Sequence, residues 1–152
     1  MFEKILYPTD CSEISLKAVD YIKNMRGAGV RKVVLLMVIS RKCRDYVAKG
    51  IALAGKDVAA FLQQACEVLS DEALKELKPV EGELRAAGFD VKVRVEEGVP
   101  ATKILEVAES ENVSAIVLGS HGRSNVAAAL LGSVSDHVIR HSKIPVLVIK
   151  RD

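Results

Sequence analysis

Short apolar runs and amphipathic segments alternate along the chain, and their order predicts an α/β protein. Brief β-branched or continuous apolar runs bounded by turn residues are typical of buried strands, whereas apolar residues at three- and four-residue steps indicate helices. In the third run valine alternates with polar residues, which predicts a strand with one wetter face. The five predicted strands are Lys4–Tyr7, Val33–Ile39, Asp90–Val95, Ser114–Leu118 and Val146–Ile149.

Helical patterns fill most of the intervals between these strands. Ser12 is the predicted N-cap of a first helix that ends near Gly27. Pro100 begins a later helix, because its fixed φ suits the first helical position. The last helix is predicted from Val134 to about His141. The apolar stripe of the first helix consists of Ile14, Leu16, Ala18, Val19 and Ile22.

The interval after the second strand is longer and less regular. Residues 41–57 carry little pattern, and we expect a mobile loop or a partner contact there. Helical periodicity starts at Val58, and Pro79 lies inside it. Proline lacks the N–H donor and its ring crowds the preceding turn, so Pro79 is expected to kink or break the helix. The pattern resumes at Leu84 and stops at Gly88.

Strands that alternate with helices predict a single open, five-stranded parallel sheet with right-handed crossovers and helices on both faces. We expect the strand order 3-2-1-4-5, a Rossmann-like arrangement. The length of 152 residues fits one domain over residues 1–152.

Composition narrows the class of partner. A net charge of +2 does not indicate a nucleic-acid or membrane surface. The longest purely apolar run, Val33–Ile39, is too short to cross a bilayer, and no signal peptide is visible at the first residues. The three cysteines stand far apart without a CxxC motif, which suits a reducing compartment. We therefore expect a cytoplasmic protein without a nucleic-acid or membrane partner.

The most specific motif follows the fourth strand and has the spacing G-x2-G-x9-G-S. Glycines at a strand end let backbone amides approach a ligand closely, and a helix starting at the last glycine would direct N–H groups and its positive dipole end at an anion. The motif predicts a phosphate cradle and hence a nucleotide site. Its expected contacts are Gly119, Ser120, Gly122, Arg123, Gly132, Ser133 and Val134.

A second group of unusual residues, Pro8-Thr9-Asp10, follows the first strand. In the order 3-2-1-4-5, strands one and four are neighbours at the reversal of strand order, where open parallel sheets bind ligands. Asp10 accepts hydrogen bonds only, so it suits ribose hydroxyls or an adenine amino group. The backbone near Val38, at the end of the second strand, could bind adenine.

Each of these residues also has a purely structural interpretation. Gly119 and Gly122 could be turn residues, and Asp10 could instead cap the first helix. Ser133 and Asp136 fit a capping box, which predicts Ser133 as an N-cap with or without a ligand. Arg123 could be a solvated surface arginine.

With these residues in view, the chain resembles the universal stress proteins of the ATP-binding type over nearly its whole length. The glycine motif matches the ATP-binding signature of that family, and Pro-Thr-Asp, Val38-Ile39 and Gly98-Val99-Pro100 match further positions. One departure is Met37, where relatives often have histidine. The resemblance implies ATP contacts at Asp10, Val38, Gly119, Gly122, Gly132, Ser133 and Val134, with Mg²⁺ held mainly through the phosphates.

The predicted function is an ATP-binding sensor or regulator in a stress response, with little hydrolysis of its own. Phosphoryl transfer needs charge stabilisation and a group that positions the nucleophile. Arg123 is the only obvious cation in the loop, and Walker A, GxGxxG and G-x-S-x-G motifs are absent from the sequence. His137 and His141 are one turn apart but have no evident third metal ligand. A slow or partner-activated ATPase, a nucleotide-free dimeric scaffold and a phospho-receiver domain are the alternatives.

The fifth strand predicts how the chain assembles. In the expected order it is a sheet edge, and Val146–Ile149 is apolar on both faces without a charge. An exposed edge of this kind is a template for pairing with another chain. We expect a two-fold homodimer in which this strand pairs antiparallel with its copy.

Overall fold

The computed structural model describes residues 1–55, 57–121 and 131–150. Within them lies a five-stranded, wholly parallel sheet in the order β3-β2-β1-β4-β5, which confirms the predicted order. Each strand matches a predicted one, and its ends differ from the prediction by at most a few residues. The strands are β1 (Lys4–Pro8), β2 (Lys32–Ser40), β3 (Asp90–Gly98), β4 (Ala115–Gly119) and β5 (Val146–Ile149).

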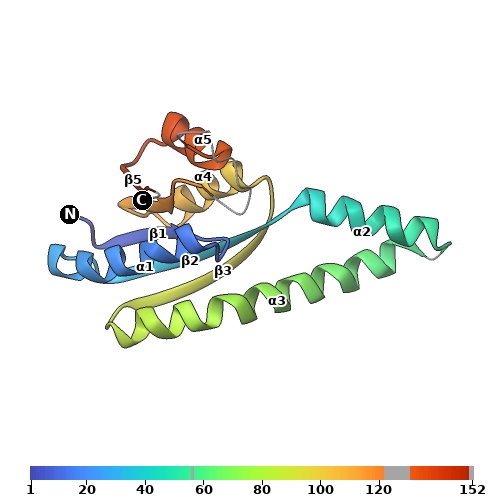
Figure 1. The fold of residues 1–152 in the computed structure, drawn as a ribbon, viewed down its shortest axis with the longest axis horizontal. Helices are drawn as coiled ribbons and strands as arrows, with labels where there is room; N and C mark the ends of the chain where they lie inside the picture. Colours follow the sequence, from blue (N-terminus) through green and yellow to red (C-terminus); the bar gives the residue numbers. More distant parts are fainter. Residues whose placement is uncertain (56, 122–130, 151–152) are drawn as a thin grey trace.

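Helices cover both faces of this sheet (Figure 1). On one face lie α1 and α3, which share a hydrophobic core with Tyr7, Val33 and Val117. On the other face α4 and α5 pack against Leu6 and Ile116. The alternation of side chains along each strand produces these two cores. The helices are α1 (Glu13–Met25), α2 (Arg41–Leu53), α3 (Val58–Ala86), α4 (Pro100–Ser110) and α5 (Ser133–His141), with a 3-10 turn at Arg26–Ala28.

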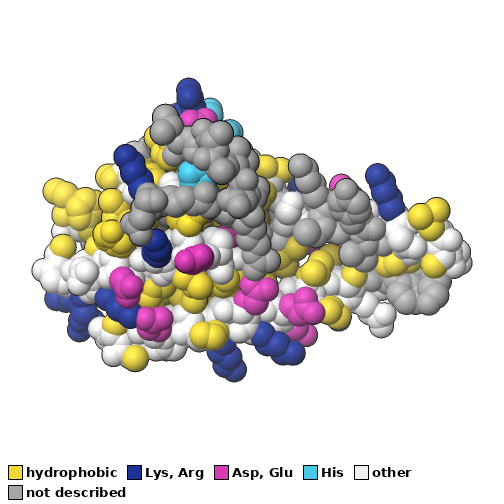
Figure 2. Space-filling model, viewed as in Figure 1, with side chains coloured by type: hydrophobic (Ala, Val, Ile, Leu, Met, Phe, Trp, Pro, Cys, Tyr) yellow, Lys and Arg dark blue, Asp and Glu magenta, His cyan; other side chains and the backbone are white. Residues whose placement is uncertain are grey.

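The expectation of a loop over residues 41–57 was wrong, because α2 occupies most of this stretch. Together with the first half of α3, it projects beyond the sheet as an arm (Figures 1 and 2). No residue whose burial is described between Arg41 and Glu72 is buried, and Leu53 is 90% exposed. The residues of α2 whose burial is described therefore form no buried stripe against the core.

Pro79 does not break α3, which runs through it to Ala86. The prediction of a break was wrong because the packing of the helix outweighs the lost hydrogen bond. Leu77, Val80 and Leu84 are buried on both sides of the proline, while Pro79 itself is exposed. Tertiary packing, more than intrinsic propensity, supplies most helical stability in proteins.

The first helix begins as predicted. Ser12 is its N-cap, and the Ser12 hydroxyl accepts a hydrogen bond from the Ser15 amide. Leu16, which the sequence assigned to the buried stripe, is exposed on the outer side of α1.

Within the described part of the chain, no helix combines the length and hydrophobicity needed to cross a membrane.

Candidate functional site

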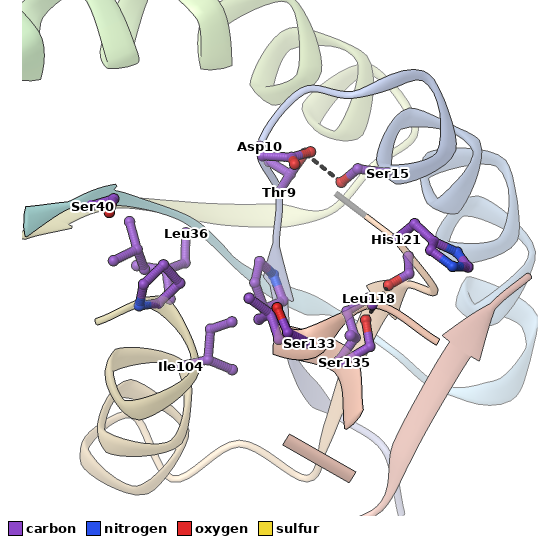
Figure 3. Close-up of a pocket in the computed structure, with 16 residues that line it drawn as sticks. Thr9, Asp10, Ser15, Leu36, Ser40, Ile104, Leu118, His121, Ser133 and Ser135 are labelled. Carbon is purple, nitrogen blue, oxygen red and sulfur yellow. Dashed lines mark hydrogen bonds between the residues drawn. The ribbon is translucent and has the colours of Figure 1, made fainter. Parts of the chain in front are cut away.

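A pocket of about 430 Å³ opens at the carboxyl ends of β1, β2 and β4 (Figure 3). Strand order reverses here, since β1 and β4 are neighbours while their connections run in opposite directions across the sheet. The pocket is lined by segments from five parts of the chain. Its described lining residues are Pro8, Thr9, Asp10, Ser15, Leu36, Val38, Ser40, Pro100, Ile104, Leu118, Gly119, His121, Gly132, Ser133, Val134 and Ser135.

The structure brings together most of the predicted site residues. Pro8, Thr9 and Asp10 line the pocket with Val38, Gly119 and the 132–134 segment. Ser120 is not among the lining residues: its side chain is buried and its hydroxyl lies 3.0 Å from Nδ1 of His121. Gly122 and Arg123 lie outside the described residues.

One part of the pocket is largely apolar and is built by β2 and α4. Leu36, Val38 and Ser40 are spaced by two residues, so they face the same side of β2. Pro100 and Ile104, from the first turns of α4, also line the pocket. Such a surface suits a flat, largely apolar group with hydrogen-bonding edges.

The loop after β1 brings a carboxylate to the pocket. Asp10 does not cap α1; instead its Oδ1 accepts a hydrogen bond of 2.9 Å from the Ser12 amide. Between them Cys11 has a φ of 58°, in the left-handed region that residues other than glycine and asparagine rarely adopt. The loop is therefore held in an unusual turn at the point where it lines the pocket.

The start of α5 presents backbone donors to the pocket. Gly132 is the N-cap and no side chain caps this end of the helix, so the predicted capping box at Ser133 was wrong. Ser133 is the first helical residue, and Asp136 pairs with Arg140 at 3.0 Å instead of turning back. Uncapped N–H groups at a helix start attract an anion through their hydrogen bonds and the helix dipole.

Gly119 is needed for a different reason from the one the motif suggested. A Cβ atom at this position would lie 3.3 Å from Cγ2 of Ile14 and 3.3 Å from Cα of Ser15. The absent side chain thus lets α1 cross closely over the end of β4. This packing brings the Asp10 loop next to the glycine motif.

The described lining of the pocket contains no lysine or arginine, and Asp10 is its only carboxylate. An anionic group bound here would therefore rely on backbone amides and hydroxyls among these residues.

His137 and His141 stack on each other with ring centroids 4.1 Å apart, and neither residue lines the pocket. In the described segments, no three His, Cys, Asp or Glu side chains gather to hold a metal ion.

Sequence reasoning missed several lining residues, and two of them had a readable signal. Leu36 and Ser40 flank Val38 at two-residue spacing, so the strand period assigns all three to one face. Ser135 had no such signal, because its role depends on a contact between separate elements. Its hydroxyl donates to the Gly119 carbonyl at 2.7 Å.

The chain is similar to known proteins over nearly its full length. The model of a family described as the universal stress protein family matches residues 1–150. Universal stress protein MJ0577 of Methanocaldococcus jannaschii is 39% identical over 156 residues, covering 99% of this chain and 96% of the relative.

Solved structures agree with this match. The structure of hypothetical protein MJ0577 superposes with a TM-score of 0.85 at 36% identity, covering 100% of this chain and 98% of the other. A universal stress protein in complex with cAMP superposes with a TM-score of 0.67 at 25% identity, covering 98% and 97%.

Proposed function

This chain belongs to the universal stress protein family, and on that premise we propose that its pocket binds ATP. Mg²⁺ would be held mainly through the phosphates, since the described residues form no metal-binding cluster. A similar protein forms a complex with cAMP, also an adenine nucleotide, which supports this class of ligand.

One observation carries the proposal: the uncapped start of α5 and the Asp10 carboxylate line the same pocket. They suit opposite parts of a nucleotide. The amides of Ser133 and Val134 and the Ser133 hydroxyl would bind phosphate oxygens. The predicted Gly132 amide contact is not open to a ligand, because that amide donates to the Ser120 carbonyl at 2.7 Å, so Gly132 would contribute by leaving space for the phosphate. A carboxylate repels phosphate and instead accepts hydrogen bonds from ribose hydroxyls or an amino group.

The apolar part of the pocket would hold the adenine ring. Val38 and Leu36 lie on one side and Ile104 on α4 provides a further apolar contact. The backbone at the end of β2 would supply hydrogen bonds to the edge of the base. The predicted contribution of Gly122 and Arg123 to the phosphates belongs to the same proposal.

The proposed role is a nucleotide-dependent sensor or regulator of a stress response. Efficient phosphoryl transfer needs a positioned base and cations at the transferred group. The described lining holds Asp10 as its only carboxylate and no lysine or arginine. We further propose a cytoplasmic homodimer, formed by one domain over residues 1–152, in which nucleotide occupancy is read by a protein partner.

Isothermal titration calorimetry with MgATP tests the binding proposal. Wild-type protein should bind one nucleotide per chain. Gly132→Val should largely abolish binding, because a branched side chain would occupy the approach to the amides at the start of α5. Gly27→Val is the matched control, since a Cβ at Gly27 meets no atom within 4 Å and the residue does not line the pocket. Equal affinity in wild type and Gly132→Val would reject the site.

A further inference from the structure

Thr9 lines the pocket, yet its hydroxyl is engaged within the protein (Figure 3). The Thr9 Oγ1 atom accepts hydrogen bonds from the Ser15 hydroxyl at 2.7 Å and from the Cys11 amide at 3.0 Å. A hydroxyl oxygen has two acceptor positions, and these two donors use both. Thr9 is only 6% exposed, so this arrangement is shielded from water.

Ser15 is itself fixed from two directions. Its carbonyl accepts a 2.6 Å hydrogen bond from the hydroxyl of Tyr7 on β1, and its amide donates to the hydroxyl of Ser12. Burial raises the pKa of Tyr7 to about 12, so Tyr7 remains a neutral donor at physiological pH. The α1 segment beside Thr9 is thus tied to the strand that precedes the loop.

These bonds bracket the unusual turn at Cys11. A φ of 58° at a cysteine costs free energy, and such a conformation persists where its surroundings hold it. The Cys11 amide is held by Thr9, and the next amide, that of Ser12, is held by Oδ1 of Asp10. Two successive amides are therefore fixed by the side chains two residues before them, with the Asp10 carboxylate as one of the acceptors.

We propose that Thr9 and Ser15 are positioning residues that hold the Asp10 carboxylate in its orientation toward the pocket. The hydrogen bond from the Ser15 hydroxyl fixes the orientation of the Thr9 side chain. Thr9 in turn accepts from the Cys11 amide and so stabilises the left-handed turn. The turn places the Ser12 amide where it donates to Asp10. Thr9 then affects nucleotide binding through Asp10 and not by direct contact. The effect on binding rests on the proposed function, whereas the order of the loop does not.

Hydrogen exchange in the absence of nucleotide tests the positioning itself. The Cys11 and Ser12 amides should be protected in the wild type. Thr9→Val, which keeps the shape but removes the acceptor, should speed exchange at both amides several-fold. Thr9→Ser retains the hydroxyl and should restore protection. If Thr9→Val accelerates exchange at Cys11 but leaves Ser12 unchanged, the turn does not orient Asp10 and the proposal is wrong.

A double-mutant cycle tests the consequence for ligand binding. Thr9→Val should weaken MgATP binding by about tenfold, the effect of one lost hydrogen bond to a charged group. In an Asp10→Ala background, the same substitution should cause almost no further loss, because residues that act through one another are not additive.

The outcomes separate this proposal from the proposed function. Additive losses of affinity in the cycle would mean that Thr9 contacts the nucleotide directly, and would overturn the positioning role. If the wild type does not bind ATP, the proposed function fails, while the exchange data still decide whether Thr9 and Ser15 order the loop. Unfolding temperatures of all variants would show whether a lower affinity reflects a loss of folded protein.

Discussion

The hydroxyl of Ser135 donates a 2.7 Å hydrogen bond to the carbonyl of Gly119, which joins the first turn of α5 to the last residue of β4. A backbone bond reinforces this connection, because the Gly132 amide donates to the Ser120 carbonyl at 2.7 Å. The start of α5 is therefore held at a defined position over the end of the sheet. Residues 122–130 separate these two segments in the chain.

Removing the Ser135 hydroxyl should affect both stability and binding. We expect Ser135→Ala to lower the free energy of unfolding by about 1 kcal/mol, the usual effect of losing a buried hydrogen bond. MgATP affinity should fall as well, because the start of α5 would be less well placed. Urea denaturation and calorimetry measure the two effects. Ser110→Ala is the control: its hydroxyl bonds Val107 and Arg94 at the exposed end of α4, so it should lower the free energy of unfolding less than Ser135→Ala does and leave MgATP affinity unchanged.

Gly119→Ala should destabilise the fold by about 1–3 kcal/mol, the range of core overpacking. The new methyl group would meet the backbone of Ser15 at 3.3 Å, and backbone gives way less easily than a flexible side chain. Gly82→Ala is the matched control: its Cβ meets nothing within 4 Å inside α3, and alanine favours helix over glycine. Thermal unfolding should move in opposite directions for the two variants. A neutral Gly119→Ala would show that α1 does not depend on this close approach.

Acid should weaken the protein through Glu111, which lies just after α4. Its carboxylate contacts Lys92 at 2.8 Å, Lys4 at 3.0 Å and Arg94 at 3.0 Å, and its side chain is only 8% exposed. The hydrogen bond from Lys92 and those from Lys4 and Arg94 lower its pKa from 4.5 to about 2. A depressed pKa stabilises the folded state above the unfolded value, and this stabilisation is lost as pH falls through the folded value.

We therefore expect Glu111→Gln to lower the free energy of unfolding at pH 7 by about 1–2 kcal/mol. It removes a carboxylate shared by three cations, but these cations are themselves 27% to 63% exposed, so solvent screens part of the interaction. The difference from wild type should shrink between pH 4.5 and about 2. Glu109→Gln is the control: that carboxylate is 71% exposed and pairs with Lys143 at 3.4 Å, so its effect should stay below about 0.5 kcal/mol. A pH-independent difference at Glu111 would contradict the ionic explanation.

Turnover of ATP by the purified protein should be very slow, well below the median of about 10 s⁻¹ for enzymes. The reason is that the described pocket lining contains no lysine or arginine and only one carboxylate, which is proposed to bind the nucleoside. Steady-state phosphate release measures this rate. Robust release that disappears in Gly132→Val would favour an ATPase over a sensor.

Strand β5 should pair with its copy in a homodimer. It lies at the sheet edge, and Leu147 is 42% exposed. Pro145 and Ile149 direct their carbonyls to β4, so strand alternation turns the N–H group of Val148 toward the open edge.

Val148→Pro should remove that outward N–H donor and leave the hydrogen bonds to β4 intact. Val148→Thr keeps the donor and serves as the control. Light scattering should report a dimer for wild type and Val148→Thr and a monomer for Val148→Pro; a wild-type monomer at micromolar concentration would reject the interface.

The sequence by itself determined the sheet, the family and the convergence of the two loops. Buried strands can be recognised from the local sequence, because apolar residues either alternate with polar ones or occupy both faces of the strand. Val33–Ile39 and Ser114–Leu118 are examples of the second pattern. Parallel crossovers then restrict the order of the strands. Once β1 and β4 are neighbours, Asp10 and Gly119, which lie at or just after the carboxyl ends of these strands, must lie at the same edge of the sheet.

Only the tertiary structure decided how these parts fit together. Pro79 remains helical because the sheet buries the residues around it, and α2 is helical although none of its residues with described burial is buried. The absent side chain of Gly119 makes room for α1, and Ser135 binds the end of a distant strand. Each of these features depends on contacts between residues far apart in the chain, so local periodicity and motif spacing do not predict them.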